Sequence, residues 1–266
     1  RIGIVPTTFG ENIALRSTAG IGELFELEDL GFSEEMVAYI NSLVTLINSP
    51  KKGGVVFITG ETGSGKTTLL SAIESKYLKL NKKVSTSEDP VEIKKSHPFL
   101  NQTEVGGDTG LTHMDALVAF LRQNSDVIVI GECRRADELI SVINAALSGH
   151  MVLTTLHTGS IEETLLRLKA MGVDLSLLAG VLKGIVSMTL ISKLCDSCKK
   201  KLENGCCERD YSGCEQCRGK GIRSVVPVAE AALFDSYDVK KMIGFANPSE
   251  IVDELKIKSS KYISME

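Results

Sequence analysis

A glycine-rich run between a strand-like segment and a helix-like segment constrains this chain more than any other feature. Residues 55–59 are apolar and β-branched or aromatic apart from a final threonine, residues 60–67 read G-E-T-G-S-G-K-T, and residues 68–80 carry apolar side chains at helical spacing. The pattern GxxxxGK(S/T) surrounds phosphate groups with backbone N–H groups, and the N-terminus of the following helix favours negative charge. The sequence therefore predicts a phosphate-binding loop inside an α/β sheet, with a ligand-free glycine turn as the alternative.

The residue types in this loop give each position a candidate role. Lys66 is predicted to reach the β and γ phosphates of a nucleoside triphosphate, and the Thr67 hydroxyl to ligate Mg²⁺. The predicted nucleotide-contacting residues of the loop are Gly60, Glu61, Thr62, Gly63, Ser64, Gly65, Lys66, Thr67 and Thr68.

Composition places the chain among globular proteins with a substantial core. Its 266 residues are 43% hydrophobic and 24% charged, and the net charge of −4 argues against a general nucleic-acid binder. The most apolar run, 177–186, is short and interrupted by Lys183, so no membrane helix is expected. Because the chain opens at Arg1 with a strand-like segment, we expect it to be the C-terminal part of a longer protein.

Strand-like and helix-like segments alternate along most of the chain. We expect a helix after Ser33, further helices at 111–123 and 137–147, and strands at 83–86, 127–130 and 150–157. Such alternation predicts a parallel sheet flanked by helices, with ligands at the carboxyl ends of its strands. Acidic and histidine residues follow these predicted strands, whereas His97 and His113 are expected to be structural or solvated.

Seven cysteines include two pairs with metal-ligand spacing. Cys195 and Cys198 form one C-x2-C pair, and Cys214 and Cys217 form another after 15 intervening residues. This spacing is typical of a tetrahedral structural Zn²⁺ site, in which four thiolates leave no open position. A redox pair or a disulfide hairpin is the alternative, and Cys206 or Cys207 could replace a predicted ligand.

Four motifs in a fixed order make the chain resemble a known family. They are GETGSGKTT at 60–68, an aspartate box EDPVE at 88–92, a Walker B-like VIVIGECR at 127–134 and a histidine box GHMVLTTLHTG at 149–159. In this order they resemble the hexameric secretion ATPases of type II secretion and type IV pilus assembly. The tetracysteine segment that follows resembles the zinc module of the assembly members.

The resemblance implies roles for residues outside the loop. Glu132, at the end of a buried strand, is the predicted catalytic carboxylate that orients or deprotonates water. Glu88 is a predicted polar or water-positioning residue, although a charged turn shaped by Pro90 is the alternative. His150 and His157 are implied phosphate or conformational sensors, or else satisfied histidines at strand ends.

The N-terminal segment resembles the last strands of the family's second N-terminal domain. Arg1 and Arg16 are candidate arginine fingers, acting in cis or in trans, with ordinary surface arginines as the alternative. The expected organisation is a domain tail and linker at 1–30, then a RecA-like P-loop ATPase domain at 31–266 with a zinc module at about 193–223.

The chain also departs from the family pattern. Val118 stands where a basic residue is usual, and Asn124-Ser125 replaces an acidic residue and a proline. Arg135 stands where an Asp is usual, and 187–192 lacks the family's arginines. These differences weaken the transfer of subunit-interface residues and leave the ATPase prediction unchanged.

The resemblance implies a motor that uses ATP, Mg²⁺ and structural Zn²⁺ to power pilus assembly or pseudopilus extension. The implied partners are five further copies in a homo-hexamer, a polytopic inner-membrane platform protein and a cytoplasmic adaptor, with no nucleic acid. The implied location is the cytoplasm, peripheral at the inner membrane of a bacterium. The alternatives are a P-loop nucleic-acid translocase and a non-hydrolysing nucleotide-binding scaffold.

Overall fold

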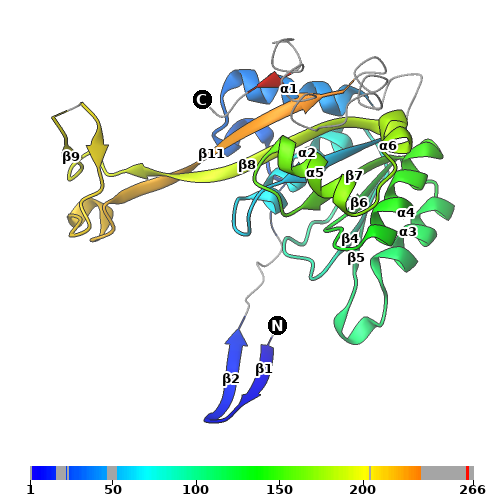
Figure 1. Ribbon diagram of the computed structural model, residues 1–266, viewed down its shortest axis with the longest axis horizontal. Helices are drawn as coiled ribbons and strands as arrows, with labels where there is room; N and C mark the ends of the chain where they lie inside the picture. The colour runs from blue at the N-terminus through cyan, green and yellow to red at the C-terminus, as the bar shows by residue number, and fades with distance from the viewer. Residues whose placement is uncertain are drawn as a thin grey trace.

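The computed structural model describes residues 2–15, 22, 24–46, 53–203, 205–234 and 262–263 (Figure 1). The strands are β1 (Ile2–Thr7), β2 (Gly10–Leu15), β3 (Gly54–Thr59), β4 (Val84–Glu88), β5 (Leu100–Glu104), β6 (Val127–Ile130), β7 (Met151–Leu156), β8 (Leu182–Leu194), β9 (Lys200–Lys201), β10 (Cys207–Glu208), β11 (Ile222–Leu233) and β12 (Tyr262–Ile263). The α-helices are α1 (Glu34–Thr45), α2 (Lys66–Lys79), α3 (His113–Arg122), α4 (Ala136–Leu147), α5 (Ile161–Ala170) and α6 (Leu175–Val181).

Most strands join one mixed sheet in the order β12-β11-β8-β3-β7-β6-β4-β5 within the described residues. The strands from β8 to β5 in this order are parallel to their neighbours, whereas β11 is antiparallel to both β8 and β12. The predicted α/β fold with a parallel sheet is therefore confirmed, with an antiparallel margin that the sequence pattern did not indicate.

Alternation along the buried strands builds a core on each face of the sheet. Val55 and Phe57 of β3 pack in one apolar cluster with residues of α3, α4, α5 and α6. Val56 and Ile58 point the other way and pack with residues of α1 and α2. Strands buried on both faces explain the continuous apolar runs in the sequence.

Local sequence signals account for where the helices begin. The Ser33 hydroxyl accepts a hydrogen bond from Met36 N at 3.2 Å and caps α1, as the sequence predicts. Thr112 and Asp115 form a reciprocal capping pair at the start of α3. Across the described residues we find no helical segment with the length and apolarity that a bilayer crossing requires.

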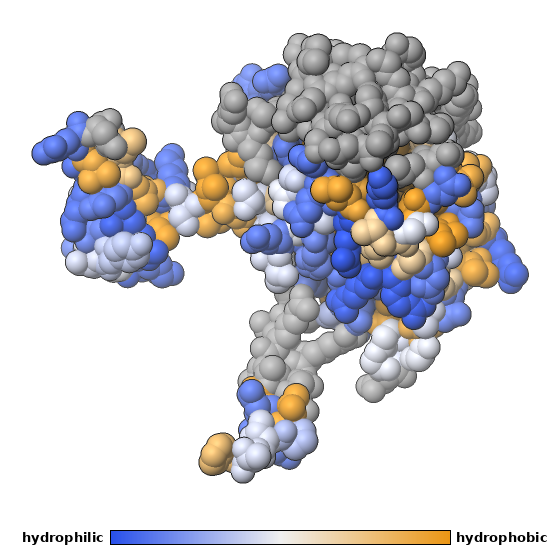
Figure 2. Space-filling model, viewed as in Figure 1, coloured by the Kyte–Doolittle hydropathy of each residue, from blue (hydrophilic) through white to orange (hydrophobic). Residues whose placement is uncertain are grey.

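Strands β8 and β11 form a ribbon that leaves the body of the molecule (Figure 1). β8 pairs with β3 only as far as Thr59↔Ser187, but its pairing with β11 continues to Leu194↔Ile222. The far half of the ribbon therefore lacks the cover of the helices, and Leu190, Ile191 and Val225 are exposed there. Figure 2 shows hydrophobic surface along the narrow part of the molecule that joins the body to its tip. The tetracysteine segment lies at its tip, and the β1–β2 hairpin stands apart from the main sheet.

Candidate functional site

The predicted phosphate loop follows β3 directly and passes into α2 at Lys66. Gly60, Gly63 and Gly65 have φ angles of 149°, 81° and 94°, which side chains rarely adopt. A Cβ on Gly60 would lie 2.3 Å from the carbonyl oxygen of Met188 and 2.4 Å from Ser64 Oγ. The loop therefore depends on glycine both for its backbone conformation and for its close contact with β8.

Two features of the loop fit a bound phosphate. The first turn of α2 presents backbone N–H groups and a dipole that favours an anion. The Ser64 hydroxyl is buried and has no hydrogen-bond partner among the described residues. A buried polar group without a partner is costly, and a phosphate oxygen would supply one.

Lys66 is the first residue of α2, and its side chain reaches back to the phosphate loop. Its Nζ donates to the carbonyl oxygens of Gly60 and Glu61 at 2.7 and 2.8 Å and lies 3.5 Å from His157 Nδ1. Burial lowers the pKa of Lys66, and the negative charge of Glu132 opposes that effect. Thr67 and Thr68 follow in the first turn of α2, so the sheet, loop and helix position all the loop residues singled out from sequence.

Three sequence motifs meet at His157. Its Nε2 lies 3.1 Å from Glu132 Oε1, while its Nδ1 faces Lys66. These residues come from the histidine box after β7, the Walker B-like strand β6 and the phosphate loop, and parallel pairing brings the carboxyl ends of these strands to one edge. Lys66, Glu132 and His157, which the sequence singled out separately, therefore lie together with His157 between the other two.

Arg134 completes this group, although no role for it was predicted from the sequence. Its Nη2 donates to Glu132 Oε2 at 2.8 Å. Burial alone would raise the pKa of Glu132, but Arg134, His157 and Lys66 outweigh it and hold that pKa below its ordinary value. Glu132 is therefore a carboxylate at neutral pH. The signal was available, because Arg134 closes the motif VIVIGECR.

A pocket of about 500 Å³ opens beside the loop. It is lined by Glu61, Thr62, His157, Thr158, Gly159 and Glu163. Glu163 Oε2 accepts a hydrogen bond from Gly159 N at 2.6 Å, which fixes the turn that leads into α5. Glu61, Thr62 and His157 belong to motifs recognised in the sequence, whereas Glu163 follows those motifs and carried no signal.

Glu88 ends β4, two strands beyond β7 in the sheet. Its Oε1 accepts hydrogen bonds from Thr86 Oγ1 at 2.6 Å and Gln102 Nε2 at 3.1 Å. The carboxylate is therefore held by defined donors at the same edge of the sheet as Glu132.

Other predicted residues do not join this cluster. His150 precedes β7, at the opposite edge of the sheet, where its carbonyl accepts from Gly54 N and its Nδ1 lies 3.0 Å from Ser148 Oγ. The structure does not bring it to the loop of its own chain, because the six residues of β7 separate it from His157. Arg1 and Arg16 lie outside the described residues.

His113, expected to be structural or solvated, lies half-buried at the start of α3. Its Nδ1 is 2.7 Å from Ser87 Oγ, next to Glu88. Burial lowers the pKa of His113, and the charges of Glu138 and Asp89 oppose that effect. The histidine therefore fixes the end of β4 against α3.

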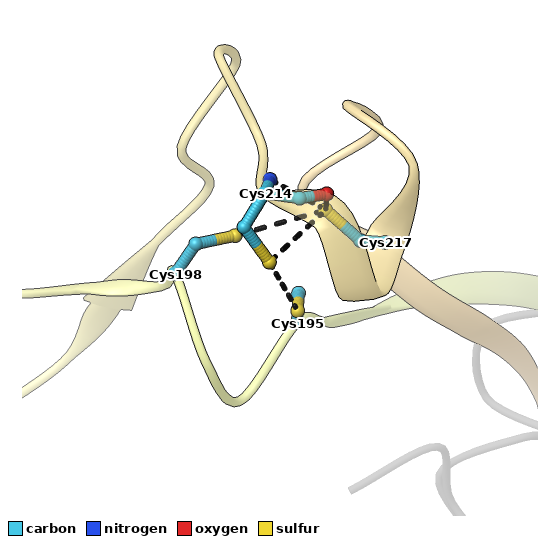
Figure 3. A group of neighbouring side chains, drawn as sticks. All are labelled: Cys195, Cys198, Cys214 and Cys217. Carbon is cyan, nitrogen blue, oxygen red and sulfur yellow. Dashed lines mark hydrogen bonds between the residues drawn. The ribbon is translucent and has the colours of Figure 1, made fainter.

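The four predicted metal ligands converge at the tip of the ribbon (Figure 3). Cys195 and Cys198 follow β8, while Cys214 and Cys217 precede β11, and the four sulfurs lie within 4.8 Å of one another. The pairs Cys195–Cys214, Cys198–Cys217 and Cys214–Cys217 have sulfur separations of 3.8 Å. Tetrahedral Zn–S bonds of about 2.3 Å require about this separation, whereas a disulfide needs about 2.05 Å.

Backbone N–H groups support the cluster from outside. Cys214 N and Gly221 N each donate to Cys217 Sγ at 3.1 Å. The first of these bonds is the main cause that lowers the pKa of Cys217 to about 6 and favours the thiolate that metals bind. The four thiolates fit Zn²⁺ in number, type and spacing.

The remaining cysteines lie elsewhere. Cys206 and Cys207 are exposed and outside the four-sulfur group. Cys133 is buried in the core with its sulfur 3.2 Å from Thr154 Oγ1, and burial raises its pKa to about 12. Cys133 is therefore an unreactive core thiol.

The chain is similar to known secretion and pilus proteins over nearly its whole length. A family model described as "Type II/IV secretion system protein" matches residues 1–263. The type IV pilus assembly ATPase PilB of Thermus thermophilus is 31% identical over 98% of this chain and 30% of its own length. The type II secretion system protein E of Dickeya dadantii is 33% identical over 88% of this chain and 48% of its own length.

Solved structures share the fold. The ATPase DotB of Legionella pneumophila has a TM-score of 0.69 and 23% identity over 99% of this chain and 65% of its own. The pilus retraction motor PilT with bound ADP has a TM-score of 0.68 and 24% identity over 98% of this chain and 66% of its own. The chain spans between 30% and 50% of the length of the curated relatives it matches. On the match across 1–263 and the shared motifs, the chain belongs to the type II/IV secretion system protein family.

Proposed function

We propose that this chain is the ATP-hydrolysing motor unit of a machine that assembles type IV pili or extends a type II secretion pseudopilus. One observation carries the proposal: His157 lies between Lys66 Nζ, at 3.5 Å, and Glu132 Oε1, at 3.1 Å. A phosphate-binding lysine and a carboxylate for water activation therefore occupy one small site. The choice of machine rests on the names of the relatives, which are a type IV pilus assembly ATPase and a type II secretion system protein.

The loop residues hold the triphosphate in this proposal. Backbone N–H groups from Gly60 to Thr68 surround the phosphates, and Lys66 exchanges its carbonyl partners for phosphate oxygens. Thr67 ligates Mg²⁺, which when bound offsets the charge of the phosphates. His157 contacts both Lys66 and Glu132, so it can sense whether phosphate has drawn Lys66 away.

Glu132 orients and deprotonates the attacking water. Arg134 and His157 keep its carboxyl group ionised, which a general base requires. Glu88 acts as a second polar residue that positions water or Mg²⁺. Arg1 and Arg16 remain candidate arginine fingers, and the boundary near residue 30 remains a prediction.

The tetracysteine cluster holds structural Zn²⁺ in this proposal. Its four thiolates complete a tetrahedron and leave no position for a substrate. The wider assignments rest on the family. They are a ring of six copies, an inner-membrane platform protein, a cytoplasmic adaptor and a cytoplasmic location at the inner membrane of a bacterium.

Glu132→Gln tests the proposal. We expect it to keep ATP affinity within a few-fold and to slow ATP turnover by about 10²-fold or more, the scale of a lost general base. Lys66→Ala should instead lose ATP binding. Normal turnover in Glu132→Gln would remove this residue from the catalytic role.

The same assay separates the alternatives. A nucleic-acid translocase should hydrolyse ATP faster when nucleic acid is added. A nucleotide-binding scaffold should bind ATP with no turnover in the unmodified protein. The motor proposal expects turnover that nucleic acid leaves unchanged.

A further inference from the structure

An ion pair is buried in the core beside the proposed site. The Lys95 and Glu74 side chains are paired and only 3% and 4% exposed. Lys79, also on α2, pairs with Glu26, and this pair is far more exposed, at 54% and 34%. Burying two charges costs several kcal/mol per ion, and apolar residues of similar volume often stabilise as well or better. Stability alone is therefore a poor explanation for this pair.

The pair joins two segments that both contribute to the site. Glu74 lies on α2, eight residues after Lys66 of the phosphate loop. Lys95 lies on the segment between β4 and β5, soon after Glu88 and the rest of the aspartate box. Burial raises the pKa of Glu74, Lys95 opposes that effect, and the negative charge of Glu88 adds a smaller increase, so the charge of Glu88 acts on Glu74.

Gln102 on β5 connects Lys95 to Glu88. Its Oε1 accepts from Lys95 N at 2.8 Å, and its Nε2 donates to Glu88 Oε1 at 3.1 Å and to Ile93 O at 2.9 Å. If the amide were flipped, its oxygen would face the oxygens of Glu88 and Ile93, and its NH2 group would face the N–H of Lys95. These partners therefore fix one orientation of the amide. Gln102 thus supplies one of the two hydrogen bonds that hold Glu88 Oε1, beside that of Thr86, and Gln102 is itself held by the segment that Lys95 ties to α2.

We propose that Gln102 is a positioning residue for Glu88, and that the buried Glu74–Lys95 pair holds Gln102 in a fixed place relative to the phosphate loop. The inference rests on the proposed function, because it concerns Glu88 during ATP hydrolysis. Displacement of a positioned group by a fraction of an ångström can lower a catalytic rate while substrate binding is retained.

A double-mutant cycle between Gln102→Met and Glu88→Ala tests the first part. Gln102→Met removes both polar atoms of the amide at similar size. We expect it to lower kcat about tenfold, the scale of one hydrogen bond to a charged group, with KM for ATP within twofold. In the Glu88→Ala background the same change should lower kcat by less than about twofold, because the carboxylate it positions is gone.

Two results would overturn this part. One is a full further tenfold loss in the Glu88→Ala background, which would mean that Gln102 acts independently of Glu88. The other is unchanged turnover in Glu88→Ala, which would remove Glu88 from the reaction while leaving the Glu132→Gln test of the motor proposal intact.

Replacing the buried pair tests the second part. Glu74→Leu with Lys95→Met removes both charges at similar volume, so the fold and Tm should be kept or raised. We expect kcat to fall about fivefold on loss of this hydrogen-bonded support, with ATP affinity within twofold. Glu26→Gln with Lys79→Met, the exposed pair that Lys79 of α2 forms, is the matched control and should leave both kcat and Tm unchanged.

An unchanged kcat in the folded buried-pair variant would make the pair purely structural. If that variant fails to fold, the pair is required for folding and the second part is rejected as stated. The Gln102 cycle then decides the first part by itself.

Discussion

The phosphate loop and the tetracysteine module are held in place in different ways. The loop follows a strand whose apolar residues are at most 1% exposed, and its partners arrive from β6 and β7 across a buried sheet. In the described part of the module, Cys195 and Cys217 are the buried side chains. The first site is therefore formed by the core of the domain, whereas the second has almost no core and depends on its own ligands.

The ribbon between them shows how the two regions remain connected. Met188 of β8 lies against the phosphate loop, since a Cβ on Gly65 would be 3.2 Å from Met188 Cε. Seven residues later the same segment supplies Cys195. One continuous strand thus contacts the loop at one end and leads to the four-cysteine cluster at the other, although the interactions that stabilise the two regions differ.

Metal removal should give the largest effect. It should unfold the tetracysteine module beyond the ribbon and leave the central sheet folded. Structural Zn²⁺ sites in small peptides contribute about 10 to 16 kcal/mol at neutral pH. We expect Cys217→Ser, or chelation of the metal, to abolish hydrogen-exchange protection in 195–221 while β3, β6 and β7 keep theirs. Elemental analysis should fall from one zinc per chain to none.

Cys206→Ser is the matched control for that experiment, because Cys206 belongs to the same module but lies outside the sulfur group. It should keep one zinc per chain. Loss of protection in the central sheet on metal removal would contradict the contrast between the two regions, and so would a metal-free module that stays protected.

Adding a methyl group at Gly60 should impair the phosphate loop and leave the tetracysteine module intact, the reverse of metal removal. In Gly60→Ala the new Cβ would meet a backbone carbonyl of β8 at 2.3 Å, at a φ that alanine rarely adopts. Strain of this kind costs about 1 to 3 kcal/mol, so we expect ATP affinity to fall about tenfold or more. Zinc content and module protection should not change.

Gly63→Ala separates the contact from the backbone strain. Gly63 also has a positive φ of 81°, but no atom lies within 4 Å of its added Cβ. Its loss of ATP affinity, measured by calorimetry beside that of Gly60→Ala, should be the smaller of the two. Equal losses would mean that contact with β8 does not shape the loop.

Segments with a local signal were predicted well from the sequence. The apolar run 127–130 coincides with β6, and the expected helix at 137–147 differs from α4 by one residue. The phosphate loop and the pairs of cysteines followed from motifs whose spacing reflects their chemistry. In each case neighbouring residues in the chain determine the local structure.

What the sequence did not indicate depends on distant pairing. The apolar run 177–186 divides into α6 and the start of β8, and β8 finds its antiparallel partner β11 some 40 residues later. Neither the ribbon nor the Gln102 contacts leave a periodic pattern. His150 is a different case, because the predicted strand at 150–157 in a parallel sheet already places it at the amino end, away from the carboxyl ends where ligands bind.

Arg134→Ala should give the smallest effect and test the electrostatics of the phosphate site. Arg134 is one of the groups that hold the pKa of Glu132 below its ordinary value against the effect of burial. A general base is active as the carboxylate, so activity is present above this pKa and is lost as pH falls through it. Without the guanidinium the pKa rises, and the acid limb of the kcat profile should move to higher pH.

The neighbouring arginine provides the control for this shift. Arg135 pairs with Asp137 and not with Glu132, so Arg135→Ala should leave the acid limb where it is. The Arg134 side chain is 74% exposed, and salt screens exposed charges. The difference between the two profiles should therefore shrink as ionic strength rises. An acid limb that Arg134→Ala leaves unmoved at low salt would mean that His157 and Lys66 alone keep Glu132 ionised.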